Sequence, residues 1–128
     1  MVTDTIQVNF DTALARGLLL RHAQVLSSSN LSHEKLDKAV LASRLFYVEV
    51  AGVRAYPAFY FGTRYDRAQL FAVTKTLGYL SGGSKWQFFM TPKGSLARSD
   101  STPRTPLQAL EDGDIELVKR AALGFVQR

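Results

Sequence analysis

The spacing of apolar residues predicts two helices at the start of the chain. Within residues 10–30 the apolar side chains recur at helical intervals, beginning with Leu14 and Leu18. A second helix is expected within residues 31–43, where Ser32 is a suitable N-cap. We therefore expect a helical pair, each member burying one apolar face.

The pattern changes to that of a β-hairpin in the middle of the chain. β-Branched and aromatic residues are concentrated in residues 45–50 and 54–61, on either side of an Ala51-Gly52 turn. Pro57 has no backbone N–H to donate, so the return strand is expected to lie at a sheet edge or to break there.

Helical spacing returns after the hairpin. Asp66 is a suitable N-cap, and Leu70 and Leu77 belong to an inner apolar stripe. Gly82-Gly83 are expected to end this helix, because glycine adopts the positive φ of a helix stop. A short helix or turn should follow, capped by Ser84.

The stretch STPRTPLQALEDGD has the composition of a corner between two helices. Thr105 is expected as an N-cap, with Pro106 at the first helical position and Gln108 completing a capping box. Gly113 should end this short helix, and Asp114 should cap the next one. Ile115 and the apolar residues that follow it at helical spacing form that last helix's inner face.

Together these elements predict an α+β fold that is mostly helical. We expect a single domain over residues 1–128, made of an N-terminal helical region (1–43), one hairpin (44–62) and a small C-terminal helical bundle (63–128).

Composition narrows the class of protein. The 128 residues include no cysteine, which excludes disulfides and cysteine-ligated metals. Neither a secretory signal nor a long apolar segment is visible, so we expect a cytoplasmic protein without membrane contact. The net charge is +5, and residues 44–104 hold nine Lys or Arg against three acidic residues. This excess fits phosphates, an acidic partner or simply a solvated surface.

Candidate catalytic chemistry is sparse. His22 and His33 have no neighbour at the i, i+4 spacing typical of metal ligands, and we expect His33 to be exposed. No catalytic residue, metal or cofactor is predicted, so the protein is interpreted as a non-enzyme. Its aromatic residues fit either core packing or a partner interface, and this group comprises Tyr56, Phe59, Tyr60, Phe61, Trp86, Phe88 and Phe89.

The combination of motifs in residues 46–125 resembles the toxin-binding domain of Xre/MbcA/ParS-type antitoxins. The matching positions are Tyr56-Pro57-Ala58-Phe59, Trp86, Thr91-Pro92, Leu96, Thr105-Pro106-Leu107, Leu110, Gly113, Val118 and Ala122. Tyr60 departs from the family, which usually has Gln there. The resemblance implies a protein that binds and blocks a toxin, commonly a RES-domain toxin that consumes NAD, through its C-terminal helices. The partner-binding residues that we predict on this basis are Trp86, Lys119, Arg120, Phe125 and Arg128.

The resemblance also implies repression of the chain's own operon through DNA. Lys35, Lys38, Arg44 and Arg54 are the predicted phosphate contacts, with the hairpin as a wing. The sequence provides no further helix to enter the major groove, so two alternatives stay open. One is a DNA-binding regulator, and the other is a stand-alone inhibitor from a mobile element that uses the same fold. A homo-oligomer is expected in each case.

Overall fold

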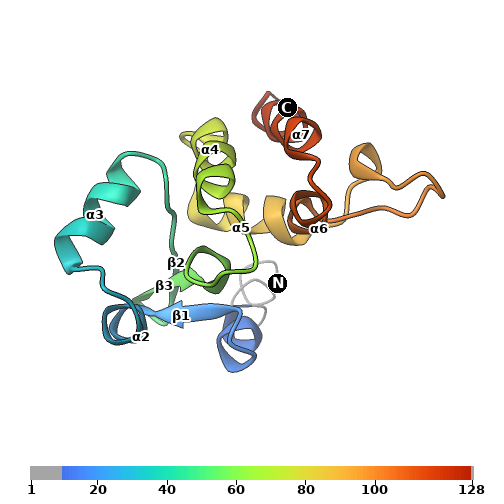
Figure 1. Cartoon of the computed structure of the whole chain (residues 1–128). Coiled ribbons are helices and arrows are strands. Elements are labelled where there is room, and N and C mark those ends of the chain that lie inside the picture. The colour runs from blue at the N-terminus through green and yellow to red at the C-terminus, as the bar shows by residue number, and fades with distance from the viewer. Residues whose placement is uncertain (1–9, 128) are drawn as a thin grey trace.

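The computed structural model describes residues 10–127, and its fold is α+β and mostly helical, as predicted (Figure 1). Residues 10–15 are helical. The remaining elements are β1 (Leu19–Arg21), α2 (His22–Ser28), α3 (His33–Leu41), β2 (Val48–Val50), β3 (Val53–Pro57), η1 (Ala58–Tyr60), α4 (Arg67–Leu77), α5 (Gly82–Met90), η2 (Gly94–Leu96), α6 (Pro106–Glu111) and α7 (Ile115–Val126).

The predicted hairpin is confirmed, and a third strand joins it. β2 and β3 are antiparallel around a tight turn in which Ala51 and Gly52 both have positive φ, 53° and 79°. β1 pairs with the other side of β3, so β3 is the central strand of the order β1-β3-β2. Of the two alternatives predicted for the return strand, the edge position was wrong, whereas the break at Pro57 is confirmed because β3 ends there. Pro57 is tolerated because it is the last residue of β3, beyond the end of β2.

The prediction of one continuous helix in residues 10–30 was also wrong. Gly17 has a φ of +75° and ends the first helical turns, and Leu19 is then buried in β1 opposite Pro57. The apolar residues Leu19 and Leu20 therefore belong to a strand, and α2 begins only at His22.

α3 and α4 begin where the sequence predicted. Ser32 accepts a hydrogen bond from the Lys35 amide, and Asp66 accepts one from the Gln69 amide. The end of α4 was misplaced, because the positive-φ residue is Gly78. Gly82 instead begins α5, which is capped by Ser81 and not by Ser84.

Gly82 is required by a close approach between α5 and the chain leading into β2. A Cβ placed on Gly82 would lie 1.8 Å from the backbone oxygen of Tyr47. The neighbouring Gly83 has no such restriction, since its Cβ would meet only ordinary contacts at 3.9 Å or more, from Phe10 and Ser81.

The capping box at Thr105 is confirmed. The Thr105 hydroxyl accepts from the Gln108 amide at 3.1 Å, and the Gln108 side chain accepts from the Thr105 amide at 2.9 Å. Gly113 has a φ of +84° at the corner into α7. Asp114 occupies the N-cap position but makes no capping hydrogen bond, and its carboxylate pairs with Arg104 at 2.8 Å.

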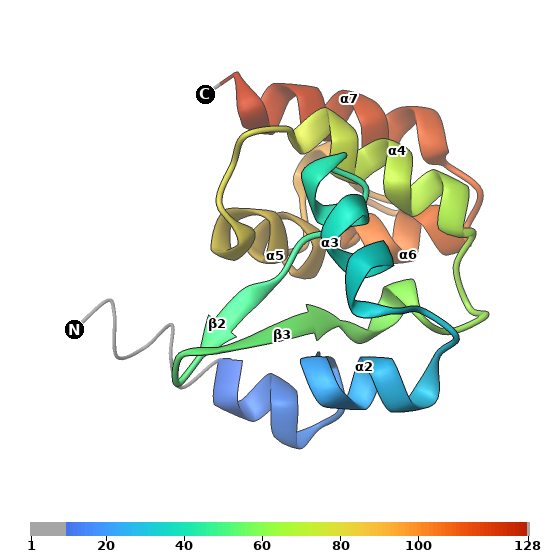
Figure 2. The same cartoon turned by 90° about the vertical axis from the view of Figure 1, so that its left-hand side faces the viewer.

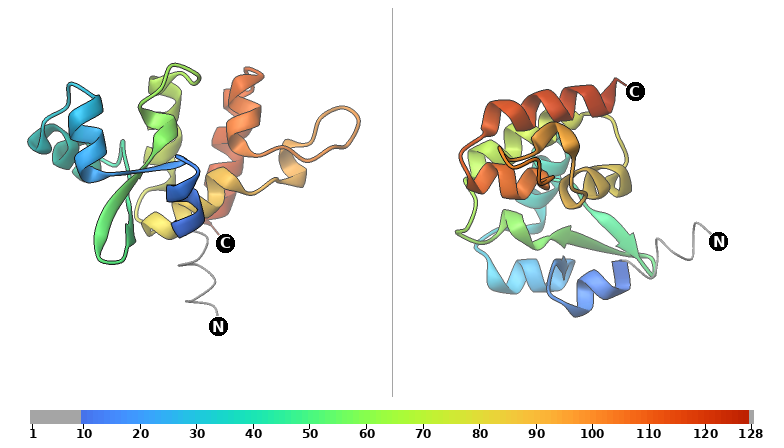
Figure 3. Two further views of the ribbon diagram at one scale, coloured as in Figure 1. Left: turned by 90° about the horizontal axis from the view of Figure 1, so that it is seen from below. Right: turned by 90° about the vertical axis from the view of Figure 1, so that its right-hand side faces the viewer.

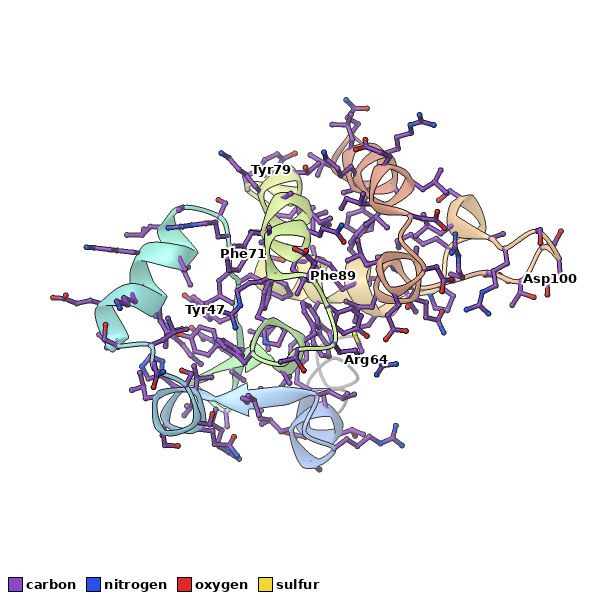
Figure 4. The ribbon with its side chains drawn as sticks, in the orientation of Figure 1. Tyr47, Arg64, Phe71, Tyr79, Phe89 and Asp100 are labelled. Atoms are coloured by element: carbon purple, nitrogen blue, oxygen red, sulfur yellow. The ribbon has the colours of Figure 1, made fainter. Side chains whose placement is uncertain are left out.

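Arg104 fixes the 93–104 loop, which projects from the molecule with Asp100 near its tip (Figure 4). The Arg104 side chain is only 5% exposed, and its Nε donates to the Leu96 carbonyl at 2.6 Å. Its Nη1 donates to the Asp112 carboxylate at 2.9 Å. These bonds hold the loop against the α6–α7 corner.

One hydrophobic cluster extends from Phe10 to Ala122 and includes most of the aromatic residues. Trp86 and Phe89 face the core, and Tyr56, Tyr60 and Phe88 are buried as well. Core packing thus accounts for most of the aromatic group, with Phe59 and Phe61 partly buried at its margin. No helix within residues 10–127 is long and apolar enough to cross a membrane.

Candidate functional site

The surface of α7 adjoins a groove of about 800 Å³. α7 packs along α4, so one of its sides is covered and the other faces outward (Figure 2). The groove lies between α7, the end of α5 and the turn containing η2; its lining residues are Gln87, Thr91, Pro92, Lys93, Gly94, Ser95, Leu117, Arg120, Ala121, Gly124 and Phe125.

Lys93, which lines this groove, is held over two aromatic rings, of which Phe125 also lines the groove and Phe88 is buried beneath it. Its Nζ lies 4.8 Å from the centre of the Phe88 ring and 5.2 Å from that of Phe125. The two rings meet edge to face at 5.3 Å. The Lys93 amide also donates to the Arg104 carbonyl at 2.9 Å. This hydrogen bond connects the backbone of Lys93 to the residue that pairs with Asp112 and Asp114.

The outward side of α7 presents apolar side chains to solvent. Leu117 is 38% exposed and Leu123 is 50% exposed, while Val118 and Ala122 face the core. Arg120 lies between the two leucines on the exposed side. Lys119 is partly buried and pairs with Glu116 at 3.7 Å. We refer to Leu117, Arg120, Leu123 and the groove as the α7 surface.

The structure separates the predicted partner-binding residues into three groups. Arg120 and Phe125 line the groove together, and Lys119 lies on the same helix outside it. Trp86 is 9% exposed and stacks on Phe59 with 6.4 Å between ring centres, so it packs in the core. Arg128 lies outside the described residues.

Lys93 was missed as a groove residue by sequence reasoning. Its position directly after the Thr91-Pro92 motif was the available signal. A residue in a loop, however, belongs to no helical or strand repeat from which the direction of its side chain could be predicted.

Three of the four predicted phosphate contacts converge on a different cavity. Lys35, Lys38 and Arg44 line a cleft of about 310 Å³ between α3 and α4. Arg54 lies elsewhere, because it donates to Asp37 at 3.0 Å and covers the Tyr47 ring at 4.4 Å.

The two histidines, expected to lack partners, belong to a chain of hydrogen bonds that joins α2, α3 and β3. The Tyr56 hydroxyl lies 3.1 Å from His22 Nδ1, and His22 Nε2 lies 3.0 Å from His33 Nδ1. His33 Nε2 then lies 3.1 Å from Asp37, which also accepts from Arg54. His33 is 65% exposed, as expected, but it does have an i, i+4 partner in Asp37.

The direction of hydrogen-bond donation along this series of side chains is set by Asp37, at its accepting end. The Asp37 carboxylate only accepts, so His33 donates to it from Nε2. With both imidazoles neutral, His33 Nδ1 then accepts from His22 Nε2. His22 Nδ1 is then an acceptor for the Tyr56 hydroxyl. Burial raises the pKa of Tyr56, which keeps that hydroxyl protonated. These hydrogen bonds hold α3 against the sheet. Residues 10–127 contain no group of three or more His, Asp or Glu side chains that could hold a metal ion.

Comparison with known proteins returned no matching family model, no matching curated protein and no matching solved structure.

Proposed function

We propose that this chain is an antitoxin-like, non-enzymatic protein that binds a partner through the α7 surface and blocks its activity. The observation that carries the proposal is the α7 surface itself: Leu117 and Leu123 are exposed beside a groove large enough to receive side chains of another protein. Exposed apolar patches rimmed by polar residues are typical of protein-interaction sites.

The sequence motifs support the same proposal. Thr105, Pro106 and Gly113, all part of the antitoxin resemblance, form the corner that sets the direction of α7. The family's partners are commonly RES-domain toxins that consume NAD. We take such a toxin as the proposed partner.

The charge on the α7 surface favours an acidic partner surface. Lys93 and Arg120 line the groove, and none of the described lining residues is acidic. A carboxylate or phosphate placed between these cations would make charge-assisted hydrogen bonds.

Co-expression with a RES-domain toxin encoded beside this chain tests the proposal. We expect the wild-type chain to restore growth and cellular NAD, and to co-purify with the toxin. The double variant Leu117→Ser/Leu123→Ser should lose both effects while keeping its melting temperature. Leu41→Ser is the matched control, because Leu41 is 85% exposed on α3, away from α7.

Equal protection by the double variant would show that the α7 surface is not the interface. Failure of the wild-type chain to bind the toxin would remove the antitoxin proposal altogether.

DNA binding is the weaker alternative. It is favoured by the convergence of Lys35, Lys38 and Arg44, but these side chains surround a concave cleft, and Arg54 is already paired with Asp37. A salt titration of binding to duplex DNA separates the two proposals, since phosphate contacts give a steep loss of affinity with salt.

A further inference from the structure

The α3–α4 cleft combines an apolar interior with a cationic rim. Its interior is formed by aliphatic and aromatic residues: Leu31, Ala39, Leu45, Tyr60, Phe61 and Phe71. Phe71 lies on the side of α4 that faces α3 (Figure 4). Tyr60 presents its ring and not its hydroxyl, because the hydroxyl is hydrogen-bonded to Thr74 on α4.

Four cations surround this interior. Lys35 and Lys38 come from α3, Arg44 from the chain that follows α3, and Arg67 from the first turn of α4. All four side chains are exposed, and no acidic residue is among those that line the cleft. Of the acidic residues on α3 and at the start of α4, Asp37 binds Arg54 and His33, and Asp66 caps α4. Glu34 is exposed on α3 and does not line the cleft.

Packing does not explain this concentration of like charge. Four uncompensated cations around one opening repel one another, and a bound anion would relieve that repulsion. A conventional surface would intersperse acidic residues among them.

The cleft's size and shape limit the occupant. A volume of about 310 Å³ is at the lower end of the range for small-molecule sites. The Tyr60 and Phe71 rings lie at 29° to each other with their centres 6.1 Å apart, giving the interior an aromatic side suited to a flat group. A duplex, which is convex and about 20 Å wide, could touch the rim but could not enter.

We propose that the α3–α4 cleft binds a small aromatic anion that carries at least two negative charges, such as a nucleoside diphosphate. The flat ring packs against Phe61 and Phe71, and the phosphates lie among Lys38, Arg44 and Arg67. This site is separate from the α7 surface, and the proposal does not depend on the chain's being an antitoxin.

Calorimetric titration of the purified chain with ADP, adenosine and pyrophosphate tests whether both features of the cleft are used. We expect saturable ADP binding, with adenosine and pyrophosphate each weaker by at least about tenfold, or about 1.4 kcal/mol. Pyrophosphate binding as tightly as ADP would reduce the site to a non-specific cationic patch. Absence of saturable ADP binding at low salt would overturn the proposal.

Charge reversal locates the site. Arg44→Glu should weaken ADP binding by about tenfold or more, because it replaces an attraction by a repulsion at the rim. Arg16→Glu is the matched control, since Arg16 is also exposed but directly follows the helical residues 10–15 and does not line the cleft. Equal weakening by both variants would show an effect of net charge alone.

Amide chemical shifts provide a readout that does not depend on variants. Addition of ADP should shift resonances in residues 31–45 and 60–71 and leave those of α7 unchanged. Shifts confined to other residues would place the ligand elsewhere and contradict the proposal. A single-stranded oligonucleotide that binds far more tightly than ADP, with the same shifts, would instead make the cleft part of a nucleic-acid surface.

Discussion

The contact between Gly82 and Tyr47 gives the sharpest test of the fold, because an adjacent glycine serves as its control. In Gly82→Ala the new Cβ would lie 1.8 Å from the Tyr47 oxygen, whereas Cβ atoms essentially never approach a non-bonded atom closer than 3.0 Å. The start of α5 and the chain before β2 must therefore separate by roughly 1 Å. Because the obstacle is backbone, rotation of a side chain cannot relieve it.

We expect Gly82→Ala to lower the free energy of unfolding by about 3 kcal/mol, the upper end of what overpacking costs. For a domain of this size that corresponds to a fall in melting temperature of roughly 10 °C. Gly83→Ala should have the opposite sign. Its Cβ meets only ordinary contacts, and alanine is favoured over glycine in a helix by up to about 1 kcal/mol.

Urea denaturation followed by circular dichroism measures both variants, and the slope of the transition checks that the unfolded states are comparable. A Gly82→Ala variant as stable as the wild type would refute the close approach of α5 to Tyr47. Equal destabilisation by both variants would assign the effect to the helix start in general.

Three further predictions concern Tyr60, Thr105 and Asp37. Burial raises the pKa of Tyr60, while an unfolded tyrosine ionises near pH 10, so stability present below about pH 10 should be lost as the pH rises further. Tyr60→Phe should flatten this alkaline loss in urea titrations between about pH 9 and 11, and an unchanged slope would contradict the assignment. Thr105→Ala should lower the free energy of unfolding by about 1 kcal/mol, and Thr105→Ser should restore it; equal losses would exclude the capping hydrogen bond as the cause. Asp37→Ala should speed amide hydrogen exchange in α3 and leave α7 unchanged, whereas uniform acceleration would indicate global destabilisation.

Local signals in the sequence were sufficient for several elements. The Thr105 capping box, the Asp66 cap and the Ala51-Gly52 turn each depend on residues within a few positions of one another, so their chemistry is readable from the chain. Gly78 and Gly82 show the limit of this approach, because either glycine could end α4 and only the contact with Tyr47 assigns Gly82 to α5.

Features that depend on distant pairing were not predictable. β1 has the composition of a helix and becomes a strand because Leu19 pairs with Pro57 across the sheet. The hydrogen bond between His22 and His33 spans eleven positions and depends on how α2 turns into α3. The α3–α4 cleft likewise depends on how two separate helices are placed in space. The ribbon views in Figure 3 show the arrangement of the helices around the sheet.

α3 is attached to the rest of the molecule through the sparse set of contacts described above. Leu36 is its only fully buried residue among those described, and the histidine chain fixes it on the side away from the cleft. A ligand bound between α3 and α4 would therefore stabilise the same position of α3 as the histidine hydrogen bonds do on its opposite side. Ligand binding and these hydrogen bonds would favour each other by an equal free energy.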